Sequence, residues 1–208
     1  MNTAAALQFV KDNYNDIRDI VNTEYLYEDS FIDEMQNNDI EYYGICCGAS
    51  KGVIIPLDLA DYVIKIPFNY NDYNDEFYAY NYCELEWANY NKAKEYGVED
   101  FFAEIEPLID IDGTVIYVQT RVKAGLWNSN NSYSYPDAKK KIEDTYGPDI
   151  YSNCPSTTIA LLLDDYSEEK VLNFLIFIDD IDINDLTENN IGIFKGKVKL
   201  FDYSGFLE

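Results

Sequence analysis

Apolar residues recur at helical intervals in several parts of the chain. Near its start they form one stripe with steps of three or four positions, made by Leu7, Val10, Tyr14, Ile17 and Val21. This stripe predicts a helix over residues 3–21. A second long helix is expected over residues 76–96, which Gly97 would end, and a third, buried helix after Ser167. Two short helices are expected around 30–35 and over 137–146.

Runs of β-branched, aromatic and other apolar residues, bounded by turn signals, predict strands. Five of them lie within the first 122 residues, at 42–47, 52–57, 62–67, 101–108 and 114–122. Short connections rich in Gly or Asp join the first three runs to one another and the last two runs to each other. The helix expected at 76–96 lies between the two groups, and we expect all five runs to form one antiparallel sheet. Two further runs, 191–194 and 198–201, flank Lys195-Gly196 and predict a hairpin. The pattern predicts an α+β fold.

Composition narrows the class of protein. Hydrophobic residues make up 47% of the 208 residues and aromatic residues 16%, which is enough to bury a core. Asp and Glu number 39 against 15 Lys and Arg, and a net charge of −24 repels nucleic acid and anionic membranes. We therefore expect no direct nucleic-acid partner and no membrane partner. A basic protein partner would suit this charge, and solubility is the simpler explanation.

Residue types and motifs that the chain lacks exclude several kinds of site. There is no His, which removes His general bases, Ser-His triads and His-ligated metals. The four Cys form no C-x-x-C pair, so neither a zinc site nor a redox motif is expected. The chain shows no signal-peptide pattern and no run of about 20 apolar residues, so we expect a cytoplasmic protein. The one basic cluster, Lys139-Lys140-Lys141, is either a solvated face or a contact with a substrate or a second copy in a homodimer.

The hairpin near the end brings candidate metal ligands together. Asn190 precedes its first strand and Asp202 follows its second, so folding places both at its open end. Carboxylate and amide oxygens paired in this way are the ligands that Mg²⁺ binds when it also holds phosphates. Asp185 is expected nearby, where it could accept a proton. The other interpretation is a surface hairpin with acidic flanks.

This arrangement resembles the catalytic core of protein-kinase-like phosphotransferases. Residues 185–190, Asp-Leu-Thr-Glu-Asn-Asn, resemble the catalytic loop, and Leu-Phe-Asp-Tyr-Ser at 200–204 resembles the segment whose Asp binds Mg²⁺. More narrowly, Asn-Asp-Leu, Asn-Ile-Gly and Asp-Tyr-Ser-Gly-Phe are similar to small kinase-like proteins encoded by bacteria and their phages. Two positions depart from the family pattern: Ile183 stands where kinases have the loop His, and Ser204 replaces a Gly.

The resemblance extends to the predicted sheet. Asp-Tyr-Val-Ile-Lys-Ile-Pro matches the kinase strand whose lysine contacts the ATP phosphates, which gives that role to Lys65, on the side opposite Ile64 and Ile66. The simpler alternative is a lysine that guards a sheet edge. Before this strand, a loop offers backbone N–H groups to phosphates at the cofactor-binding candidates Gly48, Ala49, Ser50 and Gly52. Ala49 departs from the G-x-G-x-x-G pattern, and such loops are more often only tight turns.

The helix after that strand would carry the glutamate that pairs with the lysine. Glu86 is preferred because Tyr90 and Ala93 follow on the same helical face, and Glu84 is the alternative. By the same resemblance, Gln119 lies at the back of the adenine pocket. Thr120 and Val122 belong to the hinge whose backbone would bind adenine.

The resemblance implies ATP and Mg²⁺ as cofactors and a hydroxyl of a protein Ser, Thr or Tyr as acceptor. Lys65, Glu86 and Asp185 would be catalytic, and Asn190 and Asp202 would hold the metal. The implied fold is kinase-like: a helical extension (1–40), an N-lobe with the five-stranded sheet and one helix (41–122), and a minimal, truncated C-lobe (123–208). The chain ends 6 residues after Asp202, without the usual substrate lobe.

The missing lobe, the lost loop His and the charge of −24 also fit a second hypothesis. In it the protein is a catalytically silent, pseudokinase-like protein of phage origin in the host cytoplasm. It would bind and inhibit a basic host protein, such as one that binds nucleic acid. A small-molecule phosphotransferase ranks lower, because no substrate pocket is visible in the sequence.

Overall fold

The computed structural model describes residues 3–124, 140, 143–144, 147, 154–183 and 186–203. The chain forms two compact units. The first unit consists of Met1–Trp87 and Glu104–Arg121, and the second of Ala88–Ala103 and Val122–Glu208. Residues 1–40, which we expected as an extension, thus belong to the first unit.

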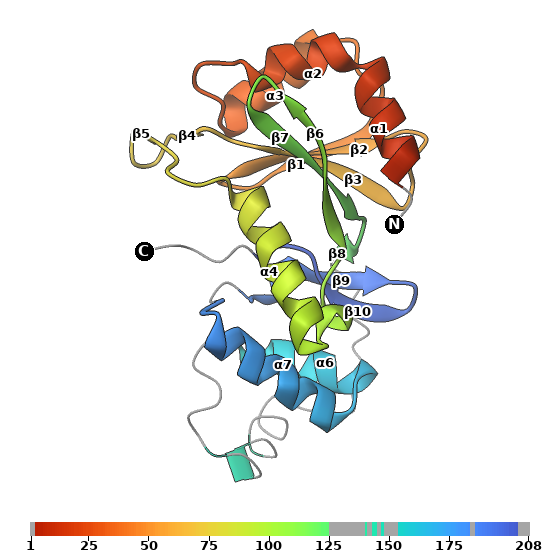
Figure 1. The fold of residues 1–208 in the computed structure, drawn as a ribbon, viewed down its shortest axis with the longest axis vertical. Coiled ribbons are helices and arrows are strands. Elements are labelled where there is room, and N and C mark those ends of the chain that lie inside the picture. Colours follow the sequence, from red (N-terminus) through yellow and green to blue (C-terminus); the bar gives the residue numbers. More distant parts are fainter. Residues whose placement is uncertain are drawn as a thin grey trace. The chain divides into compact units, whose positions relative to one another are not determined.

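A five-stranded antiparallel sheet is the centre of the first unit, as the sequence predicts (Figure 1). Its strands, in spatial order, are β1 (Tyr42–Cys47), β2 (Lys51–Pro56), β3 (Tyr62–Pro67), β7 (Thr114–Thr120) and β6 (Ile105–Ile111). Both β1 and β3 have the predicted bounds. The strand predicted at 101–108 is wrong at its start, because Glu99–Phe101 forms a 3₁₀ turn and β6 begins only at Ile105.

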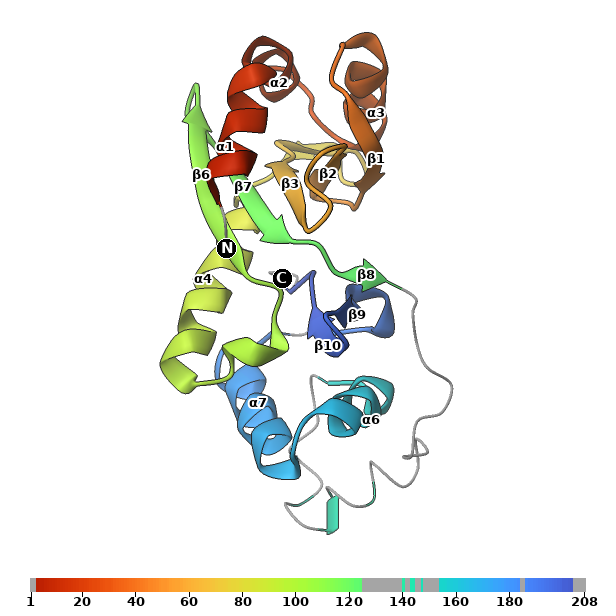
Figure 2. The same cartoon turned by 90° about the vertical axis from the view of Figure 1, so that its right-hand side faces the viewer.

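The two faces of the sheet differ because side chains alternate along each strand. On one face, Ile54, Ile64, Ile66, Ile116 and Val118 are buried in the core of this unit. Three helices supply the other half of that core: α1 (Thr3–Asp12), α2 (Tyr14–Val21) and α3 (Glu28–Asn37). Figures 1 and 2 show these helices together over one face of the sheet. The helices that we expected in an N-terminal extension thus form part of this unit's core.

The predicted helix 3–21 is two helices. They are divided at Asn13, whose side-chain amide donates to the Phe9 carbonyl at 2.8 Å, and whose backbone has φ −109° and ψ 25°. An Asn side chain that bonds a nearby carbonyl competes with the regular helix pattern. The apolar stripe is nevertheless continuous, because Val10, Ile17 and Val21 are all buried. The short helix predicted at 30–35 is present as the longer α3.

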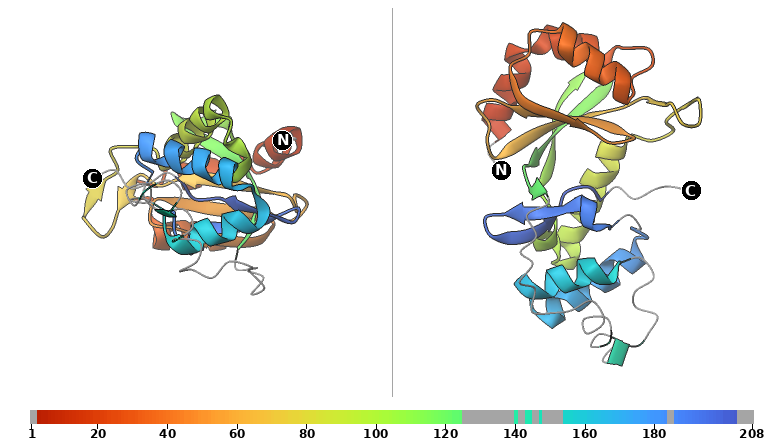
Figure 3. Two further views of the ribbon diagram at one scale, coloured as in Figure 1. Left: turned by 90° about the horizontal axis from the view of Figure 1, so that it is seen from below. Right: turned by 180° about the vertical axis from the view of Figure 1, so that it is seen from behind.

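The long helix predicted at 76–96 is wrong over its first residues. Residues Glu76–Phe77 form β5, which pairs with β4 (Tyr70–Asn71) in a small hairpin that extends from the sheet (Figures 1 and 3). The helix α4 spans only Tyr82–Tyr96. Its start is set by Asn81, whose side-chain oxygen accepts from the N–H groups of Cys83 and Glu84 at 3.0 and 3.1 Å. Gly97, with φ 71°, ends it as predicted.

The second unit contains helices and a three-stranded sheet, in the order β10 (Lys197–Leu200), β9 (Ile191–Phe194) and β8 (Lys123–Ala124). The helices α6 (Ser156–Asp165) and α7 (Glu168–Asp180) pack beside each other, and α6 also contacts β10 (Figure 2). Ser167 caps α7 as predicted, by accepting from the Lys170 N–H at 3.4 Å. An aromatic core fills the space between these elements and includes Phe101, Phe102, Tyr166, Phe174 and Phe177.

The predicted hairpin near the end of the chain is present as β9 and β10, with the second strand one residue earlier than predicted. Lys195 and Gly196 both have positive φ, at 51° and 79°. Two consecutive left-handed residues are typical of the tight turn whose twist suits a hairpin. The chain's predicted turn chemistry is therefore confirmed at this position.

Other predicted features fall wholly or partly outside the described residues. They are the short helix at 137–146, the cluster Lys139-Lys140-Lys141, Asp185 and Ser204. Among the residues that the structure does describe, no helix is long and apolar enough to cross a membrane.

Candidate functional site

The polar face of the first unit's sheet carries the candidate site. The register pairs Lys65 of β3 with Val53 of β2 on one side and with Tyr117 of β7 on the other. Cross-strand partners point to the same face, and residues two positions away along a strand do too. Lys51 of β2 and Gln119 of β7 therefore share the face of Lys65. This is the side opposite Ile64 and Ile66, as predicted.

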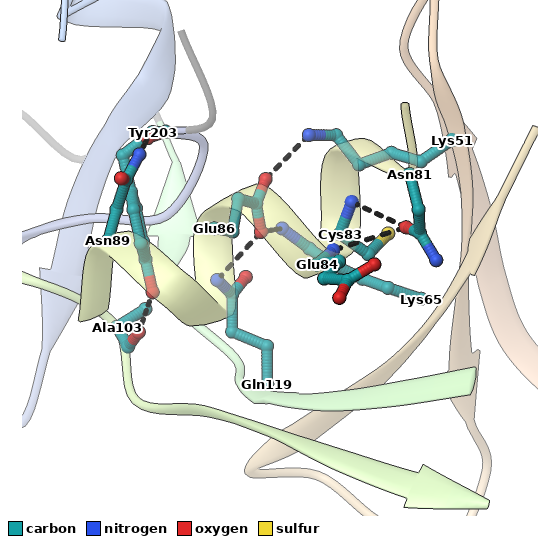
Figure 4. Close-up of polar contacts among 10 residues, drawn as sticks. All are labelled: Lys51, Lys65, Asn81, Cys83, Glu84, Glu86, Asn89, Ala103, Gln119 and Tyr203. Carbon is teal, nitrogen blue, oxygen red and sulfur yellow. Dashed lines mark hydrogen bonds and ion pairs between the residues drawn. The ribbon is translucent and has the colours of Figure 1, made fainter. Parts of the chain in front are cut away.

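Three of these side chains converge on Glu86 of α4 (Figure 4). The Lys51 ammonium lies 2.5 Å from Oε1 of Glu86, and the Lys65 ammonium lies 2.6 Å from Oε2. The Gln119 amide donates to the same Oε2 at 3.4 Å. We call these four residues the lysine–glutamate cluster. All four are buried, with Glu86 at 0% exposure.

The predicted ion pair between Lys65 and Glu86 is confirmed, and the choice of Glu86 over Glu84 is correct. Glu86 is the glutamate that binds Lys65, whereas Glu84 on the same helix is exposed. The cap at Asn81 sets the helix start, so that Glu86 faces the sheet one turn later. The buried Cys83 faces inward one turn before Glu86.

Lys51 is a site residue that the sequence analysis missed. It was assigned to the loop between β1 and β2, but it is the first residue of β2 and is 3% exposed. A signal was present: Lys51, Val53 and Ile55 alternate along β2, and Lys51 is the only charge in that strand. Two buried lysines on neighbouring strands require a shared acidic partner, because an unpaired buried charge is costly.

Cys46 of β1 and Tyr117 of β7 lie on the same face of the sheet as Lys65. Burial raises the pKa of the Cys46 thiol, and the positive charges of Lys65 and Arg121 act in the opposite direction. Cys46 belongs to the same cross-strand row as Val53 and Lys65. Burial also raises the pKa of the Tyr117 hydroxyl, with smaller contributions from Glu84 and Cys83. Both groups on this face of the sheet therefore favour their uncharged forms.

The loop Gly48–Ser50 is partly exposed. Gly48 in this loop and Gly52, which follows it in β2, have different surroundings. Gly48 has open space around its Cα, and its N–H donates to the Lys51 carbonyl at 3.0 Å. Gly52 instead lies on the face covered by helices. A side chain at Gly52 would meet the Phe31 ring of α3 at 2.6 Å. Close packing of α3 thus explains Gly52 without a ligand, and a phosphate role for Gly48, Ala49, Ser50 and Gly52 stays a prediction.

Two backbone N–H groups of the expected adenine hinge already donate hydrogen bonds within the protein. The Thr120 N–H donates to the Glu104 carbonyl at 2.8 Å, and the Arg121 N–H donates to the Asp61 carbonyl at 2.8 Å. Adenine would therefore have to bond other backbone groups of this segment, and Val122 is the next residue along the chain. The roles of Thr120 and Val122 stay predictions.

The candidate metal ligands belong to the second unit. The hairpin ladder continues beyond the pair Ile191–Leu200, because the Phe201 N–H donates to the Asn190 carbonyl at 2.9 Å. Asn190 and Asp202 are thus both at the open end of the hairpin, as predicted. Their amide and carboxylate oxygens are hard donors that suit Mg²⁺. Within the described part of the chain, no group of three or more acidic or Cys side chains could hold a metal ion.

The residue after Asp202 is fixed in the core of the second unit. Tyr203 is fully buried, and its hydroxyl donates to the Ala103 carbonyl at 2.7 Å (Figure 4). Its own carbonyl accepts from the Asn89 side chain at 3.0 Å. These bonds hold the backbone at Asp202 in a defined place. We did not predict this anchor from the sequence.

Asp185 lies outside the described residues, but its neighbours are anchored. Ile183 and Leu186 are buried on either side of it. The Thr158 hydroxyl of α6 donates to the Leu186 carbonyl at 2.7 Å. Ile183 is an apolar side chain buried in the core.

No protein-family model, no curated protein and no solved structure matches this chain.

Proposed function

We propose that the protein is a kinase-like phosphotransferase that uses ATP and Mg²⁺ to phosphorylate a protein hydroxyl. The observation that carries this proposal is the buried ion pair of Lys65 and Glu86, between the third strand of a five-stranded antiparallel sheet and the helix that follows it. In protein kinases a strand lysine paired with a helix glutamate contacts the ATP phosphates. The order of the elements along the chain agrees with that use.

The lysine–glutamate cluster has the chemistry to hold phosphates. An ammonium group has three donor protons, so a lysine can bind Glu86 and a phosphate oxygen together. Lys51 brings a second ammonium to the same carboxylate and would act on the phosphates with Lys65. Val53, Ile55 and Val63 lie on the same face of the sheet and offer an apolar surface beside these charges. A base with attached phosphates is a ligand of that character.

The remaining roles follow from the resemblance. Asn190 and Asp202 would hold Mg²⁺, which would neutralise charge on the transferring phosphoryl group. The anchor at Tyr203 would hold Asp202 in position. Asp185 would orient the acceptor hydroxyl and accept its proton. Catalysis of this kind depends mainly on positioning and charge neutralisation.

Transfer of labelled phosphate tests the proposal. The protein is incubated with γ-labelled ATP and Mg²⁺, alone and with a bacterial extract, and labelled protein is measured. We expect transfer, and a decrease of about 100-fold or more in Asp185→Asn. Asp182→Asn is the matched control, because it removes the same charge nearby and Asn tolerates the left-handed backbone found at Asp182. Absence of transfer, or transfer that Asp185→Asn leaves intact, contradicts the proposal.

Binding of a basic protein without turnover is the second candidate, and the net charge of −24 favours it. The two functions differ in what they require of the polar residues. If a captured partner is retained equally when Lys65 is changed to Met and Asp202 to Asn, binding alone is the function. If both changes release the partner, nucleotide chemistry is part of it.

A further inference from the structure

We propose that the β4–β5 hairpin and the start of α3 form a docking surface for an arginine-rich segment of a protein partner. This surface gives the binding function considered above a place on the molecule. Of the residues assigned to phosphate or metal, Ala49 lines this surface, and none of them is changed in the test below.

Exposed aromatic rings are the main feature of this surface. Tyr25, Tyr70 and Phe77 contact one another, with ring centroids 5.0 to 5.6 Å apart. Two of them remain open to solvent, Tyr25 at 46% exposure and Phe77 at 58%. Tyr73, at the tip of the hairpin, is 85% exposed. Large aromatic side chains gathered on one exposed surface are typical of protein interaction sites.

A cavity of about 190 Å³ opens beside these rings. Its lining comes from three segments and comprises Tyr27, Glu28, Asp29, Ala49, Asp72 and Tyr73. A water molecule occupies about 30 Å³ in the liquid, so this cavity has room for the head group of a side chain. The hairpin and α3 are joined here, because Tyr27 also contacts the Tyr70 ring.

Charge decides the kind of partner. Three of the lining residues are acidic and none is basic. Within the described structure, Glu28, Asp29 and Asp72 make no ion pair and no side-chain hydrogen bond. Neither of the two chain segments that build the surface contains Lys or Arg, over residues 19–50 and 66–91. The complementary partner is therefore cationic.

Arginine suits this surface better than lysine. Its planar guanidinium stacks on aromatic rings and binds carboxylates through two parallel hydrogen bonds, and it is less strongly hydrated than an ammonium. Tyr73 and Tyr27 provide rings beside the three carboxylates. An extended segment with several arginines would contact the rings and the cavity together.

Fluorescence anisotropy with labelled octa-arginine and octa-lysine peptides tests this inference. We expect octa-arginine to bind the whole protein more tightly than octa-lysine. Tyr73→Ala, at an exposed tip, should weaken octa-arginine binding about two- to fivefold. The triple change Glu28→Gln, Asp29→Asn and Asp72→Asn should weaken it about tenfold.

A matched triple variant separates a local surface from net charge. Asp19→Asn, Asp33→Asn and Asp58→Asn remove the same three charges at other exposed positions, so both triple variants have a net charge of −21. We expect this control to change octa-arginine affinity less than twofold. Equal losses in the two triple variants, equal affinity for the two peptides, or no binding would each overturn the proposal. Conversion from dimer to monomer in the first triple variant would make a second copy the occupant and overturn it too.

The outcome of the peptide-binding test does not depend on phosphotransfer. The peptide titration contains no nucleotide, and none of its variants changes a proposed catalytic or metal-binding residue. Failure of the labelled-ATP assay with intact octa-arginine binding would remove the enzymatic function alone, and the reverse outcome would remove the docking surface alone.

Discussion

At the scale of the residue, Glu86 is the position on which the polar cluster depends. It is completely buried and binds Lys51 and Lys65 through its two oxygens. If the carboxylate were removed, the buried ammonium groups of Lys51 and Lys65 would both lose the negative charge that they bind. Breaking a buried ion pair by removing one partner is much more costly than losing an exposed pair.

We therefore predict that Glu86→Gln lowers the free energy of unfolding by about 3–5 kcal/mol. Glu84→Gln is the matched control on the same helix, and because Glu84 is exposed its change should stay within about 0.5 kcal/mol. Urea unfolding followed by circular dichroism measures both. Equal stabilities of the two variants would contradict the role given to Glu86.

Asp112 gives a prediction that depends on pH. Hydrogen bonds from Asn22 and Arg18 of the α2 region hold the pKa of this carboxyl below its ordinary value of 3.8. A lowered pKa means that folding favours the charged form. Its contribution to stability is therefore present above pH 3.8 and is lost as the pH falls through the lowered folded-state pKa.

Asp112→Asn should consequently be less stable than the unchanged protein at neutral pH, with a difference that narrows steadily below pH 3.8. Asn suits the positive φ of 52° at this position, so the substitution isolates the charge. Thermal unfolding of both proteins between neutral and acid pH measures the difference. A difference that persists unchanged at the acid end would mean that the charge of Asp112 contributes nothing.

At the scale of the element, Gly52 explains how α3 approaches the sheet. The Phe31 ring of α3 occupies the space in which a Cβ at Gly52 would lie. Phe31 is fully buried, so its ring has little freedom to move away. Gly48, four residues earlier, has open space and no positive φ.

Gly52→Ala should therefore lower the free energy of unfolding by about 1–3 kcal/mol. Gly48→Ala should leave it unchanged or raise it by up to about 1 kcal/mol, because Ala restricts the unfolded chain. Both values come from denaturant unfolding. If Gly48→Ala were the more damaging change, the packing reason for Gly52 would be wrong.

Strand positions were the elements most readily predicted. The strands β1 and β3 and the turn at Lys195-Gly196 have strong local signals, namely alternating apolar residues and a turn dipeptide. The Lys65–Glu86 pair followed from the resemblance together with helical periodicity. The signals for the two strands and the turn are local and do not depend on distant parts of the chain.

Other elements depended on interactions that the pattern did not reveal. The start of α4 was predicted too early because the cap at Asn81 was not recognised, and the β4–β5 hairpin is rich in Asn, Asp and Tyr, which also suit loops. Lys51 was missed because its burial depends on Glu86, which is 35 residues away in sequence. The break at Asn13 depends on one side-chain bond.

At the scale of the whole molecule, the excess of acidic residues works against the compact state. The 39 Asp and Glu outnumber the 15 Lys and Arg by more than two to one. Repulsion between exposed charges weakens when salt screens it. Folding of such a chain should therefore depend on ionic strength.

We predict that the melting temperature rises as NaCl increases from about 10 mM to about 1 M, over which the screening length falls from about 30 Å to about 3 Å. The rise should be roughly 2–4 °C for each kcal/mol of repulsion removed. Differential scanning calorimetry at neutral pH measures it. A melting temperature that falls over this range would mean that attractive ion pairs dominate.

The proposed function depends on the lysine–glutamate cluster holding the phosphates of a nucleotide. Isothermal titration calorimetry with ATP, with and without Mg²⁺, and with adenosine tests this most directly. We predict Mg²⁺-dependent binding of ATP that Lys51→Met and Lys65→Met each weaken, while the affinity for adenosine, which has no phosphates, stays the same. No binding of ATP in the presence of Mg²⁺, or equal losses for ATP and adenosine in the two variants, would contradict the central claim.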